Sequence, residues 1–348
     1  MNFKKILAVS GVLCLLVTSL MVSAFKFSFF QKKVQTSQIE VTKGIENVQN
    51  SVWCITFQLV WNDFMDKVTN GKPVEFVGGN PQIADVLNKR IYTSDDISEN
   101  SYYKTQGEIS PKLKKTIETA LIKKFNEKSD ILNMINWNAK DAYLFYCMLK
   151  KEFTFLHAFE KLADASFNGS NEKVKYFGVK KDTDRKIKDN VKVLFYNYNE
   201  YAIKLLTNED EEVILCRTSH KGTFEDIYDA VVKDASEENL WHDDIVKVPY
   251  IDINRTITYD ELCGKQVIGT DKMIGQAIQT IKFKMDNKGG TLKSEAAIVM
   301  LKTALGPTSL YREFDFSKPF VMFLKEVGKD KPYFAARIEN TEYLVKGE

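Results

Sequence analysis

The chain has 348 residues, of which 44% are hydrophobic and 28% charged, so it can bury one large core or two small ones. Its formal net charge is only +2, and no basic or acidic tail is present. A nucleic-acid-binding role therefore has no electrostatic support.

The first residues have the pattern of an export signal. Lys4-Lys5 gives a positive start, Ile6–Met21 forms an apolar stretch, and Val22–Ala24 offers small residues for cleavage. We assign residues 1–24 to a signal peptide and residues 25–49 to a lead-in segment. The apolar run continues past the cleavage position, so an uncleaved membrane anchor is the alternative. The mature chain is expected to be secreted or at the cell surface, and to contact a membrane only if the signal is retained.

The first half of the remaining chain reads as helices and one long strand. Val52–Val68 is apolar nearly all round, which is typical of a helix inside a core. Asn80-Pro81 and Ser110-Pro111 each predict a helix start, the second leading into an amphipathic helix. Ala142–Phe155 is apolar on both faces, which predicts a central strand covered on both sides.

The second half is richer in strands. Thr223 with Asp226 three residues on predicts a capped helix. Pro249 interrupts an alternating stretch and predicts an edge strand, because proline cannot donate to a ladder. The segments expected to be strands are Val174–Lys180, Asn190–Tyr196, Tyr201–Leu206, Glu212–Cys216 and Ile245–Ile253.

A long connecting segment, which we call the tether, joins two predicted strand regions near the C-terminus. Thr280–Met285 alternates like a half-buried strand and is broken by Asn287–Gly290, while Phe314–Leu324 and Tyr333–Ile338 read as buried strands. After Asn287–Gly290, no cluster of turn-forming residues appears until Gly306-Pro307. Unstructured loops longer than about 12–15 residues are uncommon and usually functional or disordered. This tether has too many apolar and β-branched residues for disorder.

This layout resembles the serpins. Ser294-Glu295-Ala296-Ala297 is similar to the serpin hinge, and Phe316–Phe323 is similar to the strand that follows the reactive loop. Tyr333–Ile338 looks like the last serpin strand, and Val246–Pro249 resembles a strand of the form V-x-L-P. The resemblance covers roughly residues 50–340 and is strongest after residue 247.

The resemblance implies an α+β fold with a large mixed sheet, surrounding helices, a second smaller sheet or barrel and a long exposed reactive loop. Residues 50–348 would be a single domain with the loop at about 294–310. The implied hinge residues are Gly289, Gly290, Ser294, Glu295, Ala296 and Ala297, and the candidate scissile region contains Lys302, Leu305, Gly306, Pro307 and Thr308.

The implied function is inhibition of a serine or cysteine peptidase by a monomer. The peptidase would cut the loop, and the freed loop would insert between the strands at Ala142–Phe155 and Thr280–Met285. The alternative is a non-inhibitory serpin-fold protein that acts as a binding or surface module. The chain departs from the family pattern where a buried Ser, Asn and His are usual, since the corresponding positions hold Cys54, Phe145 and Gln279.

The sequence gives little support for catalysis. Its three histidines, His157, His220 and His242, have no metal-ligand spacing, so no metal, cofactor or catalytic residue is assigned. Trp53-Cys54 is only faintly similar to a papain-type nucleophile, with the order reversed. Cys54 and Cys147 are expected to lie close together behind the central strand, either as buried thiols or as a disulfide.

Overall fold

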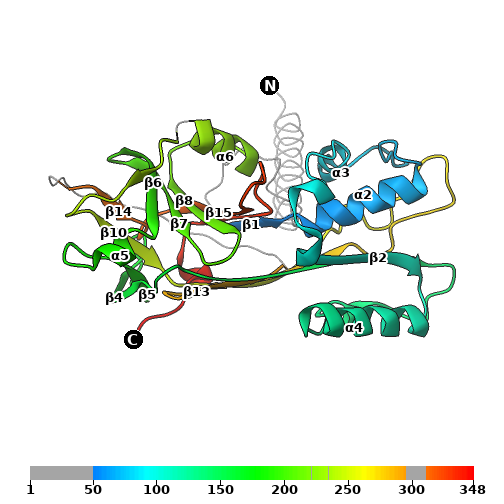
Figure 1. Ribbon diagram of the computed structural model, residues 1–348. Coiled ribbons are helices and arrows are strands. Elements are labelled where there is room, and N and C mark those ends of the chain that lie inside the picture. Colours follow the sequence, from blue (N-terminus) through cyan, green and yellow to red (C-terminus); the bar gives the residue numbers. More distant parts are fainter. Residues whose placement is uncertain (1–49, 221, 234, 295–310) are drawn as a thin grey trace, which may run out of the picture. The chain divides into compact units, whose positions relative to one another are not determined.

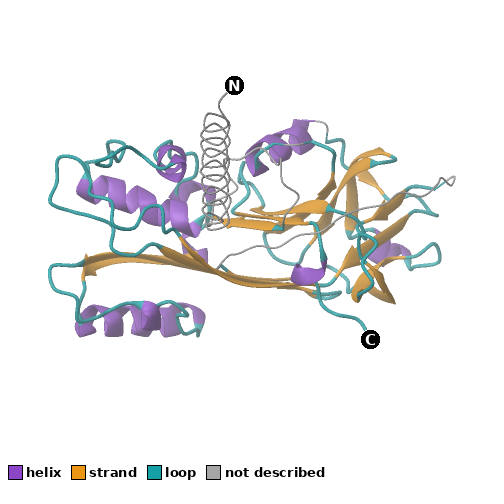
Figure 2. Cartoon of the chain, turned by 180° about the vertical axis from the view of Figure 1, so that it is seen from behind, coloured by secondary structure: helices purple, strands orange, loops and turns teal. Residues whose placement is uncertain are grey.

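Long antiparallel strands dominate the part of the chain that the structure describes. The structure is a computed structural model, and it describes residues 50–220, 222–233, 235–294 and 311–348. The strands form three sheets, and short helices pack on their faces (Figures 1 and 2).

The five-stranded sheet carries the candidate site. Its order is β11-β12-β13-β3-β2, and every pairing in it is antiparallel. β3 and β12 therefore run in the same direction, with β13 reversed between them. Its strands are β2 (Tyr102–Glu108), β3 (Tyr143–Thr154), β11 (Ile251–Thr258), β12 (Ile278–Met285) and β13 (Gly289–Lys293).

The seven-stranded sheet packs against the inner face of the five-stranded one. Phe283 of β12 meets Phe334 of β16 with ring centroids 5.0 Å apart, and both rings are fully buried. Its order is β1-β16-β15-β8-β7-β6-β9, with β1 (Ser51–Cys54), β6 (Val191–Asn197), β7 (Glu200–Leu206), β8 (Glu211–Arg217), β9 (Glu238–Asn239), β15 (Phe320–Glu326) and β16 (Phe334–Ile338).

The four-stranded sheet contains β14, the first strand after the predicted reactive loop. Its order is β14-β10-β5-β4, with β4 (Glu160–Ser166), β5 (Lys173–Val179), β10 (Ile245–Pro249) and β14 (Glu313–Asp315). β14 and β10 are parallel, whereas β10, β5 and β4 pair antiparallel.

Helices cover both faces of the β3 region, as the apolar pattern of that strand predicts. Figure 1 shows α2 (Thr56–Val68) and α4 (Pro111–Phe125) on opposite sides of the long β2 strand. Tyr146 and Met148 of β3 pack with α4, whereas Phe145 faces α2 and meets Phe64 edge-on at 5.4 Å. The other helices are α3 (Gln82–Leu87), α5 (Arg185–Lys188) and α6 (Phe224–Lys233), with one-turn 3-10 segments at Ser94–Asp96, Glu99–Ser101, Leu132–Met134 and Thr341–Tyr343.

Several local predictions about the bounds of elements were wrong. The helix expected from Val52 starts only at Thr56, because Ser51–Cys54 pairs with β16 as a strand. A short apolar run cannot distinguish these two states by periodicity. The stretch Phe314–Leu324 is two strands in two sheets, and Ile245–Ile253 likewise divides at Tyr250.

Pro249 does not make β10 an edge strand. β10 lies between β14 and β5, and Pro249 is its last residue. The β14 pairing stops opposite Lys247, so no strand needs a donor from the ring nitrogen of Pro249. The strands expected at Val174–Lys180, Asn190–Tyr196, Tyr201–Leu206 and Glu212–Cys216 and the capping of α6 by Thr223 and Asp226 agree with the structure, whereas β2 and β4 were not predicted.

Candidate functional site

The most informative feature is that β13 already lies between β12 and β3 in the uncut chain. Leu292 is opposite Phe283 on one side and opposite Lys151 on the other. We call the space between β3 and β12 the slot. Its upper half, at Lys150–Thr154 of β3, is filled by β13, and its lower half lies beyond Ser294.

Two glycines allow β13 to enter the slot. A Cβ on Gly289 would lie 2.1 Å from the backbone oxygen of Phe153, at a φ of +159°. A Cβ on Gly290 would lie 2.7 Å from the Phe153 ring and 2.8 Å from the backbone oxygen of Lys284. Backbone atoms cannot give way as a flexible side chain can, so these positions require glycine while β13 is in place.

The side chains of β13 alternate between the core and the outside. Leu292 is completely buried, and the Ser294 hydroxyl lies 3.3 Å from the hydroxyl of buried Thr56. Thr291 is exposed on the other face. Leu292 and Ser294 therefore face the core, and Thr291 faces outward.

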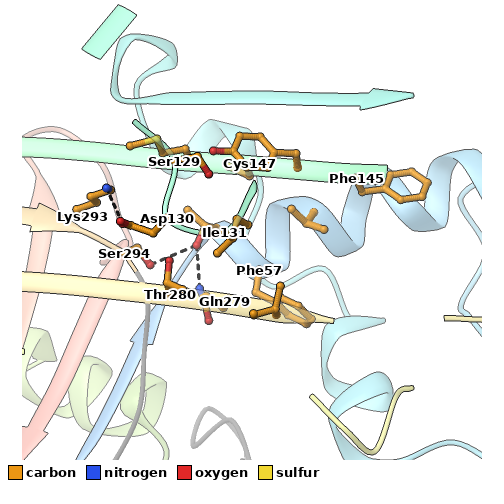
Figure 3. A pocket seen from close by; sticks show the side chains of 15 residues that line it. Phe57, Ser129, Asp130, Ile131, Phe145, Cys147, Gln279, Thr280, Lys293 and Ser294 are labelled. Carbon is orange, nitrogen blue, oxygen red and sulfur yellow. Dashed lines mark hydrogen bonds and ion pairs between the residues drawn. The ribbon is translucent and has the colours of Figure 1, made fainter. Parts of the chain in front are cut away.

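Lys293 fixes the end of β13 to the segment that follows α4. Its ammonium group lies 2.5 Å from Asp130, and Lys282 of β12 binds the same carboxylate at 2.7 Å. Burial acts to raise the pKa of Asp130, but the hydrogen bonds from Lys282 and Lys293 outweigh it, so that the pKa lies below its usual value of 3.8. We call this group the Asp130 latch (Figure 3).

A buried polar network lies directly below β13. The Gln279 amide donates to the Thr56 hydroxyl at 2.8 Å and to the Cys54 carbonyl at 3.2 Å. The Tyr259 hydroxyl donates to Gln279 at 2.7 Å. Gln279, one of the positions that departs from the family pattern, thus lies in a buried polar network with Thr56 of α2 and Tyr259.

The lower half of the slot contains a pocket of about 50 Å³. Thr280, which is 2% exposed, lines it with a hydroxyl that has no hydrogen-bond partner within the described residues. Figure 3 shows this pocket between β3 and β12, next to Lys293 and Ser294. Its other lining residues include Phe57, Ser129, Ile131, Phe145, Tyr146, Cys147, Met148 and Ile278.

Cys54 and Cys147 lie on the same side of β3, as predicted. Cys147 packs against the core cluster that contains Cys54, and both thiols are free. Burial raises the pKa of both thiols, and the proximity of Cys54 raises that of Cys147 further. Cys54 is wholly inaccessible, so a papain-like nucleophile at this position is ruled out.

Sequence reasoning missed a buried ionic cluster beside the upper slot. The Lys151 ammonium group lies between Glu211 of β8 and Glu326 of β15, with both carboxyl side chains at most 4% exposed. Burial raises the pKa of Glu211; in Glu326 burial is outweighed by hydrogen bonds from Lys151 and Ser98, and the pKa is lowered. Tyr333 donates to Glu211 at 2.6 Å, and Ser98 and Ser101 donate to Glu326 at 2.6 and 2.9 Å.

The structure describes only some of the predicted hinge residues and none of the predicted scissile region. Gly289 and Gly290 open β13, and Ser294 follows its last residue. Glu295, Ala296 and Ala297 lie outside the described residues, as does the scissile region of Lys302, Leu305, Gly306, Pro307 and Thr308.

The described residues contain neither a cluster of metal ligands nor a membrane-spanning helix. No group of three or more His, Cys, Asp or Glu side chains could hold a metal ion among them. No helix within the same residues is long and apolar enough to cross a membrane.

Comparison with known proteins identifies the fold. No family model and no curated protein matches the sequence. The thermophilic serpin Tengpin, solved in its latent state, matches with a TM-score of 0.50 at 11% identity, covering 87% of this chain and 95% of that one. The chain therefore has the serpin fold, as the sequence motifs indicated.

Two further serpin structures give lower scores. Serpin48 from the insect Tenebrio molitor has a TM-score of 0.46 at 11% identity, covering 86% of this chain and 94% of that one. A cleaved, loop-inserted ovalbumin mutant has a TM-score of 0.47 at 10% identity, covering 83% and 93%.

Proposed function

We propose that this protein inhibits a serine or cysteine peptidase by insertion of its loop into the slot. One observation carries the proposal: β13 pairs with both β12 and β3 and ends at the upper edge of the pocket between those two strands. A strand that already pairs on both sides is a template from which the following residues can extend the ladder.

The proposed reaction uses the energy of that extension. A peptidase would attack a bond in the region of Lys302–Thr308 and form an acyl-enzyme. The freed chain would then continue β13 past Ser294 into the lower slot and carry the peptidase with it. Continued in register, the next positions would lie between Met148 or Cys147 of β3 and Thr280 or Gln279 of β12. The Thr280 hydroxyl has no hydrogen-bond partner among the described residues and could bond to the added strand.

The test is a panel of trypsin, chymotrypsin and papain mixed with the protein. We expect at least one to form a covalent complex that survives SDS, with a mass equal to peptidase plus cleaved inhibitor. Ser294→Arg is the matched control, because a guanidinium against buried Thr56 should block further insertion and leave a loop that is cut without complex formation. Cleavage of the wild-type loop by all three without any complex would contradict the proposal.

A second candidate function is a non-inhibitory binding or surface module with the same fold. It is favoured by the Asp130 latch, because Lys293 holds a strand that has entered the slot before any cut. Pre-insertion lowers the energy left for cleavage to release. The discriminating measurement is the melting temperature before and after the loop is nicked: a large rise supports inhibition, and an unchanged value supports the module.

Export is part of the proposal and rests on residues 1–24 alone. Placement at the cell surface would follow if the signal is not removed. N-terminal sequencing of the protein from its native host would distinguish these cases, since cleavage after Ala24 leaves Phe25 as the first residue.

A further inference from the structure

Tyr198 is an unusual residue for the turn it occupies. It is the first of the two residues that join β6 to β7, and its φ is +40°. A left-handed conformation at this position normally selects glycine, and a bulky residue there is strained. The side chain is 63% exposed, so burial does not compensate for the strain. Strain kept at an exposed aromatic residue suggests a functional role.

Trp241 is a second exposed aromatic residue, and it is held rigidly. Its side chain is 57% exposed, yet the Arg312 guanidinium stacks on the ring at 3.8 Å. Its backbone amide donates to Asp244 at 2.7 Å, and Arg185 binds the carbonyl of Leu240 at 2.9 Å. The indole is thus oriented toward solvent by its surroundings before any partner arrives.

Buried and partly buried residues link the two exposed rings. Arg312 lies 5.7 Å from the Phe314 ring, Phe314 lies 5.1 Å from Tyr196, and Tyr196 lies 6.0 Å from Tyr198. Trp241, Arg312, Phe314, Tyr196 and Tyr198 therefore form one continuous row, which we call the aromatic ridge.

The ridge is attached to the point where the chain returns from the loop. Arg312 is 6% exposed, and its guanidinium binds Asp244 at 2.7 Å and Glu238 at 3.2 Å. Its backbone amide also donates to Asp244 at 3.1 Å. Tyr311, one residue earlier, has the Lys181 ammonium 3.9 Å from its ring centroid. The C-terminal end of the loop is therefore anchored to the ridge itself.

We propose that the two exposed rings of the aromatic ridge, Trp241 and Tyr198, form a docking surface for the body of the peptidase that engages the loop. This inference rests on the proposed function. Protease–inhibitor complexes bury about 800 Å² on each partner, so surface beside the loop can add to the contact that the loop residues make in the peptidase cleft. Tyr, Trp and Arg are the residues that most often dominate such contacts.

Pre-organisation strengthens the case for docking. The Arg312 guanidinium lies over the indole of Trp241, and the Tyr196 ring packs at a tilt against that of Tyr198, so both rings have less side-chain entropy to lose on binding. Trp241 also has a structural role, because it covers the Arg312–Asp244 ion pair. Tyr198 covers no ion pair among the described contacts, and it therefore provides the cleaner test.

Tyr198→Gly is the decisive variant, because it removes the ring and relieves the strained φ. We expect its melting temperature to equal or exceed that of the wild type. Loop cleavage by the fastest of trypsin, chymotrypsin and papain should lose about tenfold in kcat/KM, through KM with kcat unchanged, because docking away from the cut bond is uniform binding. Trp241→Ala should lose as much or more.

Met273→Ala is the matched control. Met273 is 66% exposed and lies on a loop whose residue Ile268 bonds to Glu75, away from β14. It should leave cleavage unchanged. If Tyr198→Gly and Trp241→Ala are cut at the wild-type rate, or if no peptidase cuts the loop, the docking surface is overturned. Slower cleavage of these variants without an SDS-stable complex would instead keep the docking surface and refute inhibition.

Discussion

The two halves of β3 differ in what lies beside and behind them. Lys150–Thr154 pairs with β13, and its inward Lys151 binds two carboxylates of the seven-stranded sheet. Tyr143–Leu149 pairs with β2 and borders the pocket, and its inward Phe145 and Cys147 carry no charge. We call the first the closed half, because β13 and ion pairs hold it, and the second the open half, because no described residue pairs with it on the side of β12. The same strand thus supports a fixed start and a free path for insertion.

Removing the central cation of the closed half should have the largest effect. Lys151→Met leaves Glu211 and Glu326 buried beside each other without a counter-charge, which should cost about 3–5 kcal/mol. We expect the melting temperature to fall by roughly 10 °C. Lys150→Met is the control, since its partially exposed pairs with Glu127 and Glu152 should be worth less than about 1 kcal/mol. An equal drop in melting temperature in both variants would show that the buried cluster stabilises the fold no more than the exposed ion pairs do.

A methyl group at the top of the slot should expel β13. Gly289→Ala places a Cβ against the backbone oxygen of Phe153, so the strand must leave or β3 must shift. We expect faster hydrogen exchange at Thr291 and Leu292 and a loss of about 2 kcal/mol, since overpacking a core typically costs 1–3 kcal/mol. Gly275→Ala is the control, because a Cβ there meets nothing within 4 Å. Unchanged exchange in Gly289→Ala would mean that β13 is not the strand that fills the slot.

The Asp130 latch should contribute less, and in a pH-dependent way. Because the pKa of Asp130 is lower in the folded protein than its usual 3.8, the latch stabilises the fold above that pH and loses its effect as pH falls through the lower folded value. Asp130→Asn should reduce stability by about 0.5–1 kcal/mol at neutral pH, as partly exposed pairs do. Melting curves of both proteins from pH 7 to pH 2 should converge below pH 3.8. A constant difference would assign the effect to packing.

The sequence predicted the two strands that border the slot, but not the strand β13 that fills its closed half. Period-two alternation identified β12, and apolar residues on two faces identified β3, because local pattern determines both. Gly289 and Gly290 were interpreted as ending a strand, although they begin one. Glycine can serve a turn or a close backbone approach, and the choice depends on Phe153, which is far away in sequence.

The Lys151 cluster could not be predicted for a similar reason. Its carboxylates come from β8 and β15, whose pairing brings Glu211 opposite Glu326 only in the folded sheet. Each residue alone looks like an ordinary strand charge. The Thr56 contact of Gln279 was likewise hidden, because the apolar run from Val52 obscured where α2 begins.

The smallest expected effect concerns the thiol in the open half. Cys147 is only partly buried and lines the pocket, so it should react slowly with iodoacetamide in the uncut protein. If a nicked loop extends β13 past Ser294, the added strand covers Cys147, and its labelling should slow by a further several-fold. Cys263, also free and partly buried, lies on the loop after β11 and serves as the internal control. Mass spectrometry of the two labelled peptides before and after nicking gives the ratio. An equal rate for Cys147 in both states would mean that the lower half of the slot stays open after cleavage. The difference between the closed and open halves would then persist after cleavage, and insertion would stop at Ser294.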